Sequence, residues 1–183
     1  ITLNLTVADP VNESSPADRE AARKIDGQFN RWFLDPIFRE SYPDDAVADV
    51  RTVDPVATEQ FEAAILPGDM KLISGKIDAL GINYYQGDVV AGSPVPPPPD
   101  GSAPTSRPGK SPYPNTEGVY FGDRGLPKSA MNWDVDSVNL TRILTRVHEE
   151  YSAEAGTALF VTENGTAYID EVTPGEVPAV NDQ

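Results

Sequence analysis

The sequence predicts an α/β fold in which parallel strands alternate with helices. Three short apolar runs, at residues 1–7, 77–85 and 158–163, each end in polar or aromatic side chains. Stretches with helical spacing of apolar residues separate these runs. Such alternation is typical of parallel βαβ units, and strands that are apolar on both faces are typical of buried sheets. On the residues alone, both a (β/α) barrel and an open doubly wound sheet fit this pattern.

Residues 1–7 alternate like a strand already under way, and because the first residue is Ile1 we expect a piece of a longer polypeptide. Asp9-Pro10 is expected to end this strand. Ser15 followed by Pro16, with Asp18 three residues after the cap, predicts a helix start. One apolar face at helical spacing is expected to pack in the core, and Asp35-Pro36 to close the helix. That face comprises Ala22, Ile25, Phe29, Trp32 and Phe33.

A second helix is predicted from Thr58 to Leu66, with Phe61, Ile65 and Leu66 facing inward. Pro67-Gly68-Asp69 should break it, and Met70 to Ser74 adds one further turn. The run from Ile77 to Tyr85 predicts the second strand.

Residues 92–114 hold nine of the 18 prolines in the chain, mixed with Gly and Ser. Such a stretch cannot form regular structure, and it could link two domains. We expect instead a long loop within a single domain that spans residues 1–183, because one fold continues on both sides of it.

Val119-Tyr120-Phe121 is expected to be a short extended piece. The clearest helix follows it, with Leu140, Ile143, Leu144, Val147 and Tyr151 on one face. Asp136 or Ser137 should cap this helix and Gly156 should stop it, before the strand at residues 158–163.

The ends of the three strands carry Asn4, then Asn83 and Tyr85, then Glu163. Because parallel strands end at one edge of a sheet, these groups should share a rim. Glu is almost never fully buried unless paired, so Glu163 either enters a pocket or starts a surface Glu-Asn-Gly turn.

The chain carries 29 acidic and 14 basic residues, a net charge of −15, which argues against nucleic-acid partners and anionic membrane surfaces. It has no cysteine and a single histidine, His148, expected on a solvated helix end, so any acid/base chemistry must come from carboxylates. No metal site, cofactor or glycine-rich phosphate loop is suggested.

No apolar run approaches the roughly 20 residues of a membrane span. Without a visible signal peptide we expect a cytoplasmic protein, although secretion stays open.

Four segments in order resemble the β-glucosidase family, family 1 of the glycoside hydrolases. Residues 162–165 (Thr-Glu-Asn-Gly) resemble its nucleophile motif, and residues 81–85 (Gly-Ile-Asn-Tyr-Tyr) its sixth-strand signature. Residues 131–133 (Met-Asn-Trp) resemble the segment that places an aglycone-side tryptophan. Residues 31–37 with Tyr42-Pro43 resemble a structural stretch between strands five and six.

This resemblance implies a partial (β/α)8 TIM barrel that carries roughly strands five to seven. It also implies a retaining β-glycosidase that hydrolyses terminal β-D-glycosyl residues of a β-glucoside or oligosaccharide. Glu163 would be the nucleophile, and Tyr85 would hydrogen-bond its carboxylate to keep it ionised and oriented. Asn83 would help bind the sugar, and Trp133 would stack on the leaving-group side. Tyr84 could simply be packed.

The chain departs from the family pattern at Asn132, where Gly is usual, and at Ser137-Val138-Asn139. The family's acid/base glutamate, in an Asn-Glu-Pro motif on strand four, is absent from this chain. We therefore expect the isolated segment to be unstable or aggregated and inactive, and to need the remainder of the barrel. A non-catalytic sugar-binding or structural fragment and a 6-phospho-β-glycosidase remain as alternatives.

Overall fold

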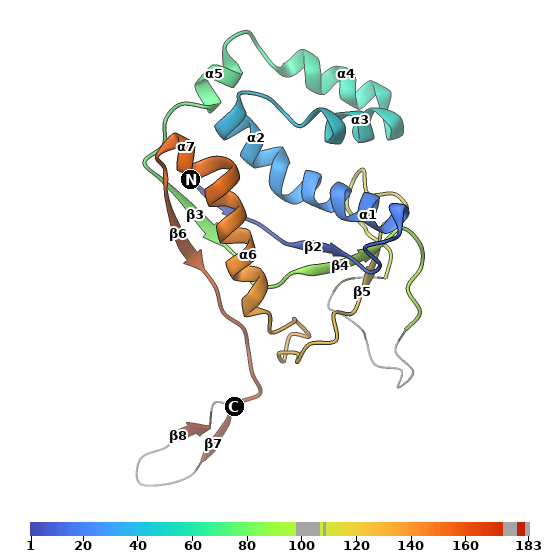
Figure 1. Ribbon diagram of the computed structural model, residues 1–183, viewed down its shortest axis with the longest axis vertical. Helices are drawn as coiled ribbons and strands as arrows, with labels where there is room; N and C mark the ends of the chain where they lie inside the picture. The colour runs from blue at the N-terminus through green and yellow to red at the C-terminus, as the bar shows by residue number, and fades with distance from the viewer. Residues whose placement is uncertain (98–106, 108, 174–178, 182–183) are drawn as a thin grey trace.

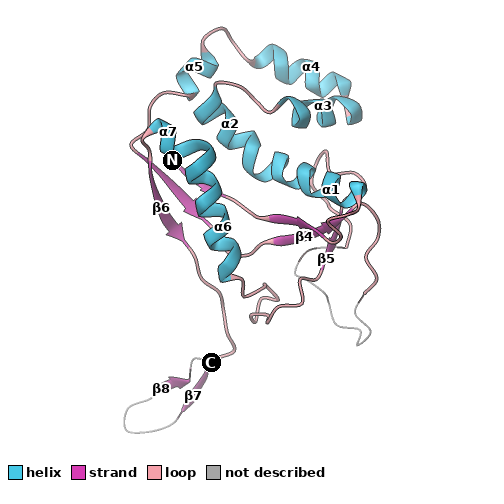
Figure 2. Ribbon diagram, viewed as in Figure 1, coloured by secondary structure: helices cyan, strands magenta, loops and turns pink. Residues whose placement is uncertain are grey.

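A computed structural model describes residues 1–97, 107, 109–173 and 179–181 (Figure 1). Its central sheet is parallel, with strands in the order β1 (Thr2–Asn4), β3 (Ala79–Asn83) and β6 (Ala158–Glu163). Helices lie along this sheet (Figure 2). The α/β fold with parallel strands is therefore confirmed, although β1 is shorter than the predicted run from Ile1 to Val7.

A second sheet continues the first one. Strands β2 (Ala8–Pro10) and β4 (Asp88–Ala91) are parallel and follow β1 and β3 along the chain, and β5 (Tyr120–Gly122) pairs antiparallel with β4. The prediction that Asp9-Pro10 ends the first strand is wrong. Pro10 is the last residue of β2, and the next N–H, of Val11, donates to the carbonyl of Val90 at 2.8 Å. Proline is tolerated there because β2 is an edge strand of this sheet within the described residues.

The first long helix consists of α1 (Pro16–Asp26), a π-helical turn η1 (Gly27–Arg31) and α2 (Trp32–Arg39). Its predicted start is confirmed, since the Ser15 hydroxyl accepts from the Asp18 N–H at 3.3 Å. The prediction that Asp35-Pro36 closes it is wrong. Pro36 is the fifth of the eight residues of α2, and the helix continues past it to Arg39.

The π turn also changes which face of the helix is buried. An extra residue in the turn rotates everything after it by about 100° relative to a regular helix. Ile25 is buried before the turn, and Leu34 and Asp35 are buried after it. Phe33 was expected in the core, but it is 49% exposed. Trp32 packs against two other rings, those of Tyr42 and Phe61, with centroids 5.4 and 5.3 Å away.

Three further helices separate α2 from β3: α3 (Asp44–Val53), α4 (Pro55–Ala64) and α5 (Asp69–Ile73). The last two confirm the predicted helix and turn, with α4 beginning earlier than Thr58. Helix α3 was not predicted, because Ala46 is its only buried residue and leaves no apolar stripe to read. Leu66, expected to face inward, is 62% exposed since it follows the end of α4.

The last helical run comprises α6 (Ser137–Val147), a π turn η2 (His148–Ser152) and α7 (Ala153–Ala155). The Asp136 carboxylate accepts from the Asn139 N–H at 3.1 Å, which confirms the predicted cap. Gly156 ends the run with φ +65°, as expected. His148 is exposed on this helix. Ile143 of α6 belongs to the same buried core cluster as Leu80 and Ile82 of β3.

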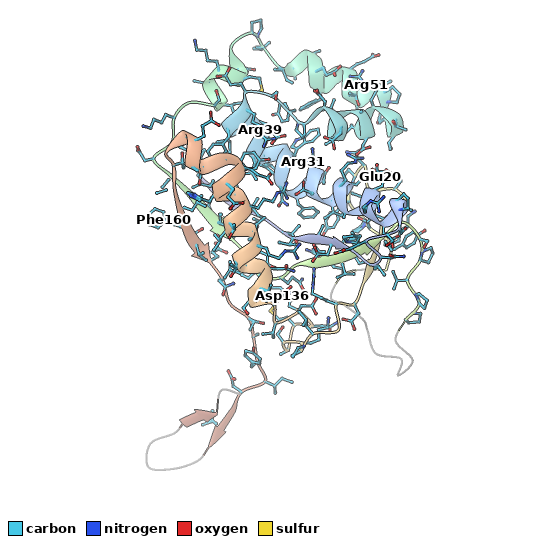
Figure 3. The ribbon with its side chains drawn as sticks, in the orientation of Figure 1. Glu20, Arg31, Arg39, Arg51, Asp136 and Phe160 are labelled. Atoms are coloured by element: carbon cyan, nitrogen blue, oxygen red, sulfur yellow. The ribbon has the colours of Figure 1, made fainter. Side chains whose placement is uncertain are left out.

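Strands β1 and β6 are the edges of the central sheet within the described residues, so the barrel is not closed. Phe160 of β6 is 58% exposed and lies on the outside of the molecule (Figure 3). Beyond β6, a hairpin of β7 (Glu171–Thr173) and β8 (Ala179–Asn181) stands apart from the body (Figure 1).

Gly81, in the middle of β3, is a point of close approach between strands. A Cβ atom there would lie 2.5 Å from Thr2 Oγ1 and 2.7 Å from Thr162 Cγ2. The side chains of both neighbouring strands thus fill the space above this glycine.

The proline-rich stretch has no helix or strand in its described residues (92–97, 107 and 109–114), apart from an isolated bridge between Lys110 and Tyr120. The remainder of the predicted loop lies outside the described residues. Its place within a single domain stays a prediction. No helix in the described part is long and apolar enough to cross a membrane.

Candidate active site

The strand register brings the predicted rim residues together. Asn4 of β1 pairs with Asn83 of β3, and Asn83 pairs with Glu163 of β6. The register shifts by one residue between Ile82 and Asn83, so that Glu163 rather than Thr162 stands opposite Asn83. This irregularity decides which side chain of β6 reaches the rim, because neighbouring residues of a strand point to opposite faces.

Tyr85 and Glu163 contact each other directly at this rim. The Tyr85 hydroxyl donates a hydrogen bond to Glu163 Oε2, and both side chains are exposed. This hydrogen bond, together with smaller contributions from desolvation and from the charge of Glu163, raises the pKa of the Tyr85 hydroxyl. The raised pKa favours the protonated phenol, which can act as the donor, and the hydrogen bond fixes one carboxylate oxygen of Glu163 beside Tyr85.

Asn83 and Tyr84, which come just before Tyr85 in the chain, each connect to β6 or to the turn after it. Asn83 is buried, and its Oδ1 accepts a hydrogen bond from the Thr162 hydroxyl at 2.7 Å, which ties β3 to β6 just before the rim. Tyr84 is also buried, which agrees with the expectation that its side chain could simply be packed in the core. The Asn164 amide donates to the Tyr84 carbonyl at 2.7 Å, so the turn after Glu163 is held against β3.

Trp133 reaches the same rim from the loop before α6. Its ring lies 5.4 Å from that of Tyr85, centroid to centroid, with the planes inclined by 53°. The Ser129 hydroxyl accepts from the Trp133 N–H at 3.2 Å, and the Ser129 N–H donates to the Trp133 carbonyl at 2.9 Å. Asn132 has φ +59°, a left-handed conformation that Asn tolerates better than most residues. The replacement of Gly at this position is therefore compatible with the turn.

A hollow of about 350 Å³ opens beside these residues. Asn4, Asn83, Tyr85 and Trp133 line it, together with Phe29 and with Arg107 from the proline-rich stretch. The sequence analysis missed Arg107, since a single arginine in a stretch without periodicity gives no placement. Arg107 forms an ion pair with Asp88, the first residue of β4, and this acidic residue just beyond the predicted second strand is the signal that could have pointed to it.

Other charged groups are paired away from the rim. A hollow of about 980 Å³ lies between α1 and α6, and its lining includes Asp9, Asp26, Arg142 and Arg146 but not Glu163. Arg142 pairs with Asp9 and Arg146 with Asp26. The described residues contain no group of three or more His, Cys, Asp or Glu side chains that could hold a metal ion.

Residues 1–183 match the family model described as "Glycosyl hydrolase family 1" over their whole length. The chain belongs to glycosyl hydrolase family 1. It is 33% identical over 177 residues to the "1,4-beta-D-glucan glucohydrolase" of Thermotoga neapolitana, an alignment that covers 96% of this chain and 34% of that protein. It is 32% identical over 175 residues to the "Bifunctional beta-D-glucosidase/beta-D-fucosidase" of Bifidobacterium breve, covering 96% and 33%.

This family 1 chain is also similar in structure to the psychrophilic beta-glucosidase BglU from Micrococcus antarcticus. The two share 42% sequence identity with a TM-score of 0.81, over 100% of this chain and 37% of that one. The chain therefore spans about a third of the length of these relatives, and its strands and helices match part of a (β/α)8 barrel.

Proposed function

We propose that the complete protein is a retaining β-glycosidase that hydrolyses terminal β-D-glycosyl residues, with Glu163 as its nucleophile. The observation that carries this proposal is the hydrogen bond from Tyr85 to Glu163 on the rim where three parallel strands end. Barrel enzymes place their chemistry at the carboxyl ends of the strands, and here a carboxylate is held there, exposed and oriented. The family to which the chain belongs supports the same reaction.

In this mechanism the Glu163 carboxylate attacks the anomeric carbon, and the bond to the leaving-group oxygen breaks to give a covalent glycosyl-enzyme. A second carboxyl group, about 5–5.5 Å away in retaining enzymes, protonates the leaving group and then activates water. No residue of this chain is assigned to that second role. Tyr85 holds the nucleophile, Asn83 contributes to sugar binding, and Trp133 offers an apolar face to the leaving group.

The decisive experiment treats the complete protein with a 2-fluoro aryl β-glucoside and maps the labelled residue by mass spectrometry. We expect a covalent label on Glu163 and its absence from the Glu163→Gln variant. That variant should also lose turnover of an aryl β-glucoside by more than about 1,000-fold. Glu59→Gln, at an exposed position on α4, is the matched control and should behave like the unaltered protein. A label on another residue would overturn the assignment.

The alternatives give different outcomes. A non-catalytic sugar-binding or structural protein would bind glucose without labelling or turnover. A 6-phospho-β-glycosidase would hydrolyse the 6-phosphorylated aryl glucoside in preference to the unphosphorylated one. We also expect residues 1–183 expressed alone to lack activity, because two sheet edges and the apolar surface near Phe160 stay uncovered. Turnover by this segment near that of the complete protein would contradict that expectation.

A further inference from the structure

Arg107 connects the proline-rich stretch to the second sheet through a buried carboxylate. Its Nε donates to Asp88 Oδ1 at 2.9 Å and its Nη2 to Asp88 Oδ2 at 3.3 Å. The Asp88 side chain is only 2% exposed, and its Oδ2 also accepts from the Thr6 hydroxyl at 2.9 Å. A two-point contact between a guanidinium and a carboxylate fixes direction as well as distance. Asp88 thus holds Arg107 in one orientation.

Three aromatic rings surround the same guanidinium. Its central carbon lies 5.9 Å from the ring centroids of Phe29 and Tyr113 and 5.7 Å from that of Phe121. Arg107 Nη1 also donates to the Tyr113 hydroxyl at 2.7 Å. Cations are attracted to ring faces at such distances. The Phe29 ring comes from η1, which is distant in sequence, whereas Tyr113 and Phe121 follow Arg107 closely in the chain. Arg107 therefore joins its own part of the chain to the first long helical run.

Arg107 also forms part of the wall of the hollow that contains Asn83, Tyr85 and Trp133. We propose that Arg107, held by Asp88, is a specificity-determining residue that sets the shape of the leaving-group side of the site. This inference rests on the proposed function, because it takes Trp133 to face the leaving group. The effect is one of shape rather than charge, since the Asp88 carboxylate compensates the guanidinium locally.

The test compares two substrates of the complete protein that differ only in the leaving group. Cellobiose carries a second sugar ring that would enter the hollow, whereas β-glucosyl fluoride carries a single atom that cannot fill it. With Arg107→Met we expect kcat/KM for cellobiose to fall by about 10- to 100-fold, because a misplaced wall loses substrate positioning. For β-glucosyl fluoride we expect kcat/KM to stay within about twofold of the unaltered protein.

Matched variants separate shape from folding. Arg107→Met leaves Asp88 buried without its cation, so the double variant D88N/R107M removes both charges and should show the same selective loss. Arg107→Lys keeps the charge without the fork and should fall in between. Arg51→Met, which breaks an exposed pair with Glu62 on the remote helices, is the control, and thermal unfolding of every variant is measured in parallel.

Equal losses on both substrates in folded variants would overturn the inference, as would unchanged cellobiose hydrolysis in the double variant. If the unaltered protein hydrolyses neither substrate, the proposed function itself is refuted. The two failures are therefore distinguishable by the β-glucosyl fluoride assay of the unaltered protein.

Discussion

Replacing Asn30 by Ala should destabilise the junction between the two sheets. Asn30 lies in the π turn and is 1% exposed. Its Oδ1 accepts from the Thr6 N–H at 3.0 Å, and its Nδ2 donates to the Thr6 carbonyl at 2.8 Å. The side chain thus pairs with Thr6 as a neighbouring strand would, where the chain passes from β1 to β2.

The structure allows the cost of this substitution to be worked out. Thr6 is itself buried, so Asn30→Ala leaves one backbone donor and one backbone acceptor without a partner. Each unsatisfied buried group costs about 1–3 kcal/mol, which gives about 2–6 kcal/mol for the pair. The lower end applies if water enters the space that the amide vacates.

Hydrogen exchange of the Thr6 amide in the complete protein measures this directly. A loss of about 2 kcal/mol accelerates exchange from the opened state by about 30-fold, and a larger loss accelerates it further. Gln28→Ala is the matched control, since Gln28 lies in the same π turn and its side chain makes no hydrogen bond within the described part of the chain. If Asn30→Ala exchanges at Thr6 as slowly as Gln28→Ala, the reasoning is wrong.

Three further substitutions follow from single contacts. Asn132→Val should lower the free energy of unfolding by about 1–2 kcal/mol more than Asn132→Gly, because a β-branched residue resists the left-handed conformation; thermal unfolding of both variants compares them. Tyr84→Phe should leave stability unchanged or raise it by about 1 kcal/mol in chemical denaturation, since the buried Tyr84 hydroxyl has no hydrogen-bond partner within the described residues. Burial raises the pKa of Asp26, but hydrogen bonds from Arg146 and Asn30 and the charges of Arg146 and Arg31 outweigh it, so the pKa is lowered. A carboxyl group whose pKa is lowered in the folded protein stabilises the fold at pH values above its pKa in the unfolded chain, which is near 4. This stabilisation is lost as the pH falls through its pKa in the folded protein. The destabilisation by Asp26→Asn should therefore be largest at pH 7 and shrink toward pH 3, as measured in unfolding scans.

The parts of the fold that the sequence predicts are those where burial follows a regular period. Leu80 and Ile82 are fully buried in β3, and Ile143 marks the inner face of α6, as their spacing indicates. The period fails at the π turn, because one additional residue moves the buried face from the Phe33 side to Leu34. A pattern search that assumes a constant 3.6 residues per turn cannot detect this change.

The same distinction applies to the candidate site: contacts between residues at strand ends could be predicted from the sequence, and contacts made by aperiodic stretches could not. Tyr85 and Glu163 could be placed near each other from sequence because both follow parallel strands that end at one rim. The contact between Arg107 and Asp88 could not, since it depends on where an aperiodic stretch returns to the sheet. Asn132 lies between these cases: the resemblance marked it as a departure from the family's Gly, and the structure adds that Asn132 adopts a left-handed conformation.

Gly81 has a consequence for any attempt to redesign the pocket. The sheet depends on the missing side chain at this position, because the Thr2 and Thr162 side chains already occupy the space where a methyl group would go. Even alanine would have to force those threonines aside, and Asn83 lies only two residues further along β3 and Glu163 only one residue beyond Thr162 on β6. Engineering for bulkier sugars should therefore leave this position alone and begin with outer residues such as Trp133.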